Sequence, residues 1–175
     1  AMLAANIAPG LKRGFLSGKW SNLIDKQVWD DAYEEAREMV SIDTNVDIQG
    51  YDIDKSVIEA ARSNATRAGI MDMLHLQCRD VASLSHPKKY GFIITNPPYG
   101  ERLEEKENLP AIYKSLGDRY AALDSWSLYL ITSYDDAQKY IGKEADKNRK
   151  IYNGMMQTRF YQYMGPKPPK RTGRE

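Results

Sequence analysis

Short apolar runs alternate along this chain with longer segments in which the apolar residues recur at helical spacing. The runs with the length and composition of buried strands are residues 46–51, 73–78, 90–95 and 127–132. Helical spacing predicts helices at residues 26–40, 55–68, 109–123 and 134–141. The Ala-rich residues 1–8 are also helical in character. Residues 9–22 begin with a proline and contain three glycines, and they predict a loop.

Two of the predicted helices have clear boundary residues. Asp25 and Asp54 each stand directly before a helical segment, where a carboxylate can accept hydrogen bonds from the free N–H groups of the first turn. Gly69 follows the second of these helices, and glycine readily adopts the left-handed conformation that ends a helix. The strand before this helix must therefore end near Asp52.

The alternation of strands and helices predicts an α/β fold built on a doubly wound, Rossmann-like sheet. Two further strands, near residues 150–152 and 158–164, flank Asn153-Gly154, a pair typical of a tight hairpin turn. We therefore expect a C-terminal antiparallel hairpin at one end of the sheet. A ligand of such a sheet binds beyond the carboxyl ends of the strands. Polar residues follow three of the predicted strands there, namely Asp52, Asp80 and Asn96.

Composition limits the kind of protein. The 175 residues, 42% hydrophobic and 28% charged, fit one globular domain, and the net charge of +1 gives no overall basic field. No apolar run has the length of a membrane helix, and the start of the sequence lacks the pattern of a signal peptide. Cys78 is the only cysteine, which excludes a disulfide framework. The chain has only two histidines in addition, too few to form a zinc cluster with it. We expect a cytoplasmic protein without a metal site.

The tetrapeptide Asn96-Pro97-Pro98-Tyr99 carries the clearest chemistry. It directly follows an apolar strand. The lone pair of an exocyclic or amide nitrogen is delocalised, which makes such a nitrogen a poor nucleophile. An Asn oxygen and a nearby backbone carbonyl can accept both of its N–H bonds and direct the lone pair at a methyl donor. The prolines fix the backbone in advance, and Tyr99 offers an aromatic face on which a flipped base can stack. The pattern favours methyl transfer to such a nitrogen over a chance proline-rich turn.

Asp52 and Asp80 are weaker signals when each is considered alone. A carboxylate just past a strand, as at Asp52, can hold both hydroxyls of a ribose, and it can equally be a turn or capping residue. Asp80 can accept the adenine amine of a cofactor, or it can belong to an ordinary turn after a strand. The order Asp52, Asp80 and then the tetrapeptide is more informative than any one member.

Three segments carry a resemblance to a known family. They are Gly50-Tyr51-Asp52-Ile53-Asp54, Ala60-Ala61-Arg62-Ser63-Asn64-Ala65 and Thr95-Asn96-Pro97-Pro98-Tyr99-Gly100-Glu101-Arg102-Leu103. They resemble the class I S-adenosylmethionine methyltransferases, and in particular the THUMP-associated rRNA guanine-N2 methyltransferases, often labelled N6-adenine-specific DNA methylases. The Gly-Glu-Arg-Leu extension after Tyr99 is the specific part. The shorter Asn-Pro-Pro-Tyr motif is shared with DNA adenine and protein glutamine methyltransferases.

The resemblance implies roles for individual residues. Asn96, Pro97, Pro98 and Tyr99 would be catalytic, with the target amine bound by Asn96 and the Pro97 carbonyl. S-adenosylmethionine would be held by Asp52, Ile53, Asp80, Val81 and Asn96. Gly100, Glu101 and Arg102 would form a substrate loop. The substrate implied is guanine in large-subunit rRNA, with adenine in DNA as the alternative.

The sequence also departs from the family pattern. It contains no G-x-G pattern of the kind that approaches the methionine end of the cofactor. The resemblance implies that the first strand, this glycine-rich loop and an upstream THUMP domain are missing. We therefore expect residues 1–165 to be a partial catalytic domain, inactive alone, followed by a basic, proline-rich tail at 166–175. A vacant position is expected between the strands ending at Asp52 and Asn96, filled by a separate N-terminal piece of the same protein or by another copy. A non-catalytic nucleic-acid-binding fragment is the alternative.

Overall fold

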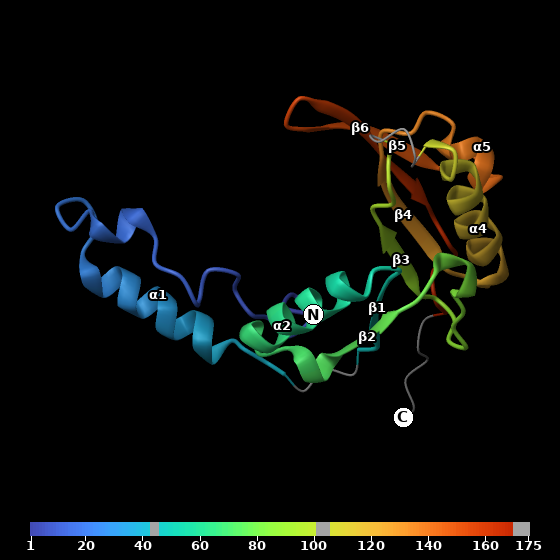
Figure 1. Cartoon of the computed structure of the whole chain (residues 1–175). Coiled ribbons are helices and arrows are strands. Elements are labelled where there is room, and N and C mark those ends of the chain that lie inside the picture. The colour runs from blue at the N-terminus through green and yellow to red at the C-terminus, as the bar shows by residue number, and fades with distance from the viewer. Residues whose placement is uncertain (43–45, 101–105, 170–175) are drawn as a thin grey trace. The chain divides into compact units, whose positions relative to one another are not determined.

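The computed structural model describes residues 1–42, 46–100 and 106–169, and at Asn153 only the backbone. The predicted substrate-loop residues Glu101 and Arg102, and the last six residues of the basic tail, lie outside the described residues. The chain forms two compact units, Ala1–Cys78 and Arg79–Glu175 (Figure 1). Each unit is described by itself.

The first unit contains a β–α–β arrangement. Strand β1 (Ile48–Asp52) pairs in parallel with β2 (Leu74–Cys78), and they are joined by helix α2 (Lys55–Ala68) and the short 3-10 helix η2 (Met71–Met73). Asp52 and Cys78 are opposite each other at the carboxyl ends of the two strands. The expected parallel pairing is thus present, and it places Asp52 at the end of a strand.

Both predicted N-caps are confirmed. The Asp25 carboxylate accepts a hydrogen bond from the Gln27 N–H at 2.8 Å at the start of helix α1 (Lys26–Glu38), and Asp54 caps α2 in the same way. Helix α2 ends at Gly69, whose φ of 76° is the left-handed conformation expected there. These local signals were sufficient because cap and turn chemistry depends on neighbouring residues alone.

The helical expectation for residues 1–8 is wrong. This segment forms hydrogen-bonded turns, with one bond of helical type from the Ala5 N–H to the Ala1 carbonyl at 2.9 Å. Asn6 has a φ of 53°, a left-handed conformation that interrupts a right-handed helix. Its side chain instead donates to the Met39 carbonyl at 3.0 Å. The loop that follows contains the 3-10 helix η1 (Leu16–Lys19).

The second unit is a four-stranded mixed sheet in the order β3-β4-β6-β5. Strand β3 (Phe92–Thr95) runs parallel to β4 (Ser127–Thr132). Strand β6 (Met156–Tyr163) is antiparallel to both β4 and β5 (Lys147–Asn153). The C-terminal hairpin was predicted, and β6 lies between β4 and β5 within the sheet.

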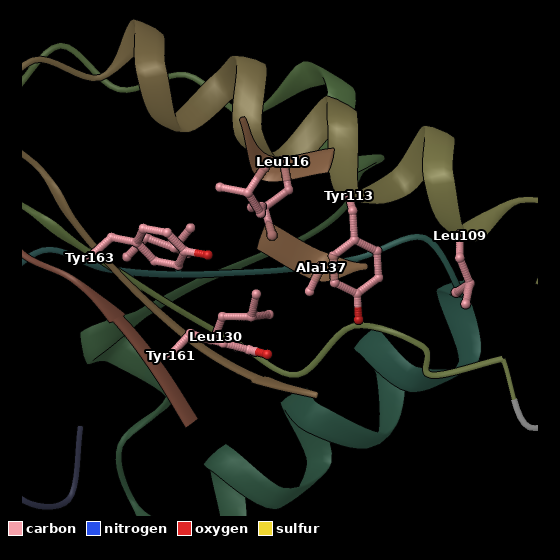
Figure 2. Packing of buried hydrophobic residues seen from close by; sticks show 9 residues of the cluster. Leu109, Tyr113, Leu116, Leu130, Ala137, Tyr161 and Tyr163 are labelled. Carbon is pink, nitrogen blue, oxygen red and sulfur yellow. The ribbon is translucent and has the colours of Figure 1, made fainter. Parts of the chain in front are cut away.

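The register of these strands defines the hydrophobic core. Leu128 is opposite Tyr163 and Leu130 is opposite Tyr161, so their side chains share one face. Helices α4 (Leu109–Ala122) and α5 (Ala137–Ile141) pack together with this face, and η3 (Val81–Ser83) contacts α4 (Figure 1). Figure 2 shows the resulting cluster, which includes Leu109, Tyr113, Leu116, Leu128, Leu130, Ala137, Ile141, Tyr161 and Tyr163.

On the opposite face of this sheet, strand β3 presents exposed apolar side chains. Phe92 and Ile94 of β3 are 64% and 81% exposed. The rings of Phe92, Tyr129 and Phe160 stack in sequence across three strands, at centroid separations of 6.2 and 6.1 Å. Within the described ranges, β3 pairs with β4 alone and forms one edge of the sheet.

The hairpin turn lies one residue later than predicted. Asn153 pairs with Met156, so the two turn residues are Gly154 and Met155 instead of Asn153 and Gly154. Gly154 has a φ of 61°, as required of a glycine at the first turn position. Both the predicted and the observed turn contain Gly154. The register in which β5 and β6 pair along their whole length determines which of the two forms.

Among the described residues, β1 pairs only with β2, and β3 pairs only with β4. The positions of the two units relative to one another are not determined. The expected vacant position between the strands ending at Asp52 and Asn96 therefore stays a prediction.

Candidate active site

The Asn96–Tyr99 turn begins directly where β3 ends. Asn96 is exposed and Tyr99 is half-buried, and the Tyr99 hydroxyl donates a hydrogen bond to Asn96 Oδ1. Gly100 is buried, with a φ of 78°, and a Cβ there would lie 2.7 Å from Leu109 Cδ1. The left-handed conformation therefore favours glycine at this position, and a Cβ there would also displace the Leu109 side chain.

The two proline carbonyls of the turn differ in their surroundings. The Pro98 carbonyl accepts a hydrogen bond of 3.2 Å from the Tyr113 hydroxyl of α4. No hydrogen bond to the Pro97 carbonyl is found within the described part of the chain. Pro97 consequently offers the backbone acceptor that a bound amine could use.

Asp80 is the N-cap of η3. Its Oδ1 accepts a hydrogen bond from the Ala82 N–H at 2.7 Å, and its carbonyl accepts one from the Ser83 hydroxyl at 2.7 Å. The turn interpretation of Asp80 is therefore correct as local structure. Among the described residues, Oδ2 of Asp80 and the N–H of Val81 make no hydrogen bond. An acceptor and a donor from adjacent residues are thus left for a ligand.

Asp52 ends β1 and also makes a local turn. Its Oδ1 accepts a hydrogen bond from the Asp54 N–H at 2.9 Å, and Asp54 in turn caps α2 through Ser56. Hydrogen bonds from the Ser56 hydroxyl and N–H lower the pKa of the Asp54 carboxyl below its ordinary value. Ile53 is 72% exposed, beside the strand end. In the parts of the chain that are described, the second oxygen of Asp52 makes no hydrogen bond.

The structure places the predicted residues in both units. Asp52 and Ile53 belong to the first unit, while Asp80, Val81 and the turn at 96–100 belong to the second. Asp52 and Asn96 lie at strand ends, as the sequence predicts. Their roles toward a ligand stay predictions.

Sequence reasoning missed Tyr113 and Thr132, whose hydroxyls lie 2.5 Å apart beside the turn. Tyr113 occupies a core position of a predicted helix, and nothing in the helical pattern distinguishes it from a packing residue. Its contact with Pro98 joins residues 15 positions apart and requires the tertiary structure.

The described ranges hold neither a metal cluster nor a membrane helix. No group of three or more His, Cys, Asp or Glu side chains there could hold a metal ion. No helix in these ranges is long and apolar enough to cross a membrane.

Comparison with known proteins identifies the family. Residues 1–162 match the model of the UPF0020 family, described as an RMKL-like methyltransferase domain. The chain belongs to this methyltransferase family. The match covers both units and includes every described residue of the candidate site.

Relatives support the assignment over nearly the whole chain. The sequence is 37% identical to a putative RNA methyltransferase, YpsC, of Bacillus subtilis over 98% of this chain and 44% of that protein. It is 32% identical to the ribosomal RNA large subunit methyltransferase K/L of Shewanella baltica over 93% of this chain and 24% of that protein. The chain therefore spans less than half the length of these relatives.

A solved structure shares the fold. The crystal structure of SMU.472, a putative methyltransferase complexed with SAH, is 34% identical and matches with a TM-score of 0.89. The match covers 96% of this chain and 44% of that one. The predicted α/β methyltransferase fold is confirmed.

Proposed function

We propose that the protein transfers a methyl group from S-adenosylmethionine to the 2-amino group of a guanine in large-subunit rRNA. The observation that carries the proposal is the Asn96–Tyr99 turn at the carboxyl end of β3, in a chain of the RMKL-like methyltransferase family. Two relatives are named as methyltransferases of RNA, one of them of large-subunit rRNA.

The turn provides the acceptors that this chemistry requires. Asn96 Oδ1 accepts one hydrogen bond, from Tyr99, and an amide oxygen has a second lone pair for a bound amine. The Pro97 carbonyl would accept the other N–H bond. With both N–H bonds directed in this way, the nitrogen lone pair would be drawn out of conjugation and aimed at the methyl group that S-adenosylmethionine would supply. One of the two N–H protons would pass to solvent, and the Tyr99 ring would hold the base by stacking.

The described residues fit the cofactor in chemical type. Asp52 and Asp80 each keep one carboxylate oxygen without a hydrogen bond among the described residues. Asp52 would bind the two ribose hydroxyls, with Ile53 beside it. Asp80 would accept the adenine amine, and the Val81 N–H would donate to the adjacent ring nitrogen. When bound, S-adenosylmethionine supplies the electrophilic methyl group. The crystallised relative in complex with SAH supports this choice of cofactor.

Asn96→Ala is the direct test. It removes one of the two acceptors, and loss of a single positioned polar group in an active site costs about 100- to 1,000-fold in rate. Methylation of rRNA by the full-length protein should fall by at least about 100-fold, measured by transfer of a labelled methyl group. Asn22→Ala, at an exposed loop position, is the matched control. Unchanged activity of Asn96→Ala would refute the proposed role.

Adenine in DNA is the alternative substrate, because the same turn can orient its exocyclic amine. Digestion of the methylated product to nucleosides identifies the modified base. Recovery of N2-methylguanosine supports the proposal, whereas N6-methyladenine in DNA selects the alternative.

Residues 1–175 without further polypeptide should bind S-adenosylmethionine weakly and transfer no methyl group. The sequence contains no G-x-G pattern to approach the methionine end of the cofactor. Calorimetric titration of this chain should give a dissociation constant weaker than about 1 μM, that is, less than about 8 kcal/mol of binding free energy. Tighter binding would show that these residues form a complete cofactor site. The alternative is a non-catalytic nucleic-acid-binding module. In that case Asn96→Ala would leave the affinity for RNA unchanged, and the full-length protein would transfer no methyl group.

A further inference from the structure

A chain of hydrogen bonds connects the turn at residues 96–99 to the core of the second unit. The Tyr113 hydroxyl lies 3.2 Å from the Pro98 carbonyl oxygen and 2.5 Å from Thr132 Oγ1. The Tyr134 N–H donates to Thr132 Oγ1 at 3.0 Å. Figure 2 shows Tyr113 reaching from α4 toward the coil of this turn.

The direction of each bond follows from the chemistry of the groups. A carbonyl oxygen can only accept, so the single proton of Tyr113 is donated to Pro98. Thr132 must then donate its own proton to the Tyr113 oxygen. Thr132 in turn accepts from Tyr134. Each hydroxyl in the series donates once and accepts once, with the Pro98 carbonyl as the final acceptor.

This hydrogen-bond network is buried in the core of the second unit. Tyr113 is 0% exposed and Thr132 is 1% exposed, so water does not replace the bonds. Tyr163 lies in the same core, also 0% exposed, and its hydroxyl has no partner among the described residues. The core therefore holds one tyrosine hydroxyl with two hydrogen bonds and another with none. Packing alone does not account for the bonds of Tyr113.

The Pro98 carbonyl is the point at which the turn can still rotate. The proline ring fixes φ, which leaves ψ as the free backbone dihedral of Pro98. The value of ψ determines the direction of the Pro98 carbonyl. It also determines the position of Tyr99, because the peptide plane that contains this carbonyl continues into Tyr99. A bond from a rigid core helix to this carbonyl therefore fixes how Tyr99 leaves the turn. It also leaves Pro97, instead of Pro98, as the available acceptor.

We propose that Tyr113 and Thr132 are positioning residues for methyl transfer, which hold the Pro98 peptide so that Asn96, the Pro97 carbonyl and Tyr99 face the target base together. This inference rests on the proposed function of the turn. Neither residue touches the reacting atoms. Their effect is on the geometry of the turn, and hence on the rate of the chemical step rather than on cofactor binding.

Variants of the full-length protein test this role. Tyr113→Phe and Thr132→Val remove one hydroxyl each with little change in volume. Each should lower kcat for rRNA methylation by about 10- to 100-fold, the scale expected for misplacement of reacting groups. The dissociation constant for S-adenosylmethionine should stay within about twofold. Thr132→Ser keeps the hydroxyl and should restore most of kcat. Tyr163→Phe is the matched control, and its kcat should not change.

A measurement besides activity separates this inference from the proposed function. Amide hydrogen exchange of the segment 96–100 should become faster in Tyr113→Phe and Thr132→Val, and should be unchanged in Thr132→Ser and Tyr163→Phe. If Asn96→Ala abolishes activity while Tyr113→Phe matches Tyr163→Phe in kcat and in exchange, the positioning role is wrong and the proposed function stands. If Asn96→Ala keeps full activity, the proposed function fails, and the positioning role fails with it even where exchange shows that the hydroxyls order the turn.

Discussion

Tyr113 keeps its proton over the whole physiological range of pH. Burial raises the pKa of its hydroxyl from an ordinary 10.0 to about 12, against a smaller lowering by the hydrogen bond with Thr132. The protonated form is the one that can donate to the Pro98 carbonyl. Burial also raises the pKa of Tyr163, which has no such bond among the described residues. The two residues share an environment, and only one can influence the turn.

The raised pKa of Tyr113 predicts a loss of stability at alkaline pH. Above pH 10 the unfolded chain releases the phenolic proton while the folded chain retains it, so the free energy of unfolding falls as pH rises from 10 to 12. This difference between the folded and unfolded pKa corresponds to at most about 2.7 kcal/mol for one group. Tyr113→Phe should make the decline shallower, measured by urea unfolding at pH 9, 10 and 11. Tyr152→Phe, at an exposed position, is the control. Equal declines in all three proteins would contradict the prediction.

Helices α4 and α5 approach each other through a glycine. A Cβ on Gly117 of α4 would lie 2.4 Å from the carbonyl oxygen of Ile141, the last residue of α5. This is backbone contact, which cannot move aside as a flexible side chain can. The close approach keeps both helices against the core side of the sheet, where α4 presents Tyr113.

Gly117→Ala should therefore destabilise the second unit, although alanine is the better helix former by about 1 kcal/mol. The expected loss is roughly 1–3 kcal/mol in the free energy of unfolding, the usual scale for overpacking. Urea unfolding followed by circular dichroism measures it. At Gly14 a Cβ would have no neighbouring heavy atom within 4 Å, so Gly14→Ala serves as the control and should change stability little. A Gly117→Ala protein as stable as wild type would show that α5 can shift.

Elements were predictable from the sequence where local chemistry decides them. The caps Asp25 and Asp54 and the terminating Gly69 depend on adjacent residues, and they fixed the helix boundaries. The helical expectation at the N-terminus failed because the left-handed Asn6 interrupts a segment with helical composition. The hairpin turn and the Tyr113 contact depend on strand register and on distant packing, which the local pattern does not contain.

At the scale of the whole molecule, strand β3 presents exposed apolar side chains on one face of the four-stranded sheet. Ile94 is 81% exposed on this face, whereas Leu128, on the neighbouring strand and the opposite face, is fully buried. An exposed apolar edge strand is a template for association with other chains. Isolated residues 1–175 should therefore self-associate through β3.

Ile94→Lys tests this expectation. In residues 1–175 the change should alter the free energy of unfolding by no more than about 0.5 kcal/mol, as for an exposed position, and it should reduce self-association. Light scattering and urea unfolding provide the two measurements. Leu128→Lys is the contrasting variant, and burying its charge should prevent stable folding. If Ile94→Lys destabilised the fold as much as Leu128→Lys, this would show that Ile94 on the β3 face is covered in solution.

The strand order of the second unit has a consequence for protein synthesis. Strand β6 is the last of the four to be made, yet it lies between β4 and β5 and joins them. Domains can begin to fold while the ribosome is still adding residues. Here β3, β4 and both helices emerge before the strand that supplies Tyr161 and Tyr163 to the core. A nascent chain paused before Met156 therefore has no partner for one side of β4, and this unit can complete its sheet only after residue 163 has been added.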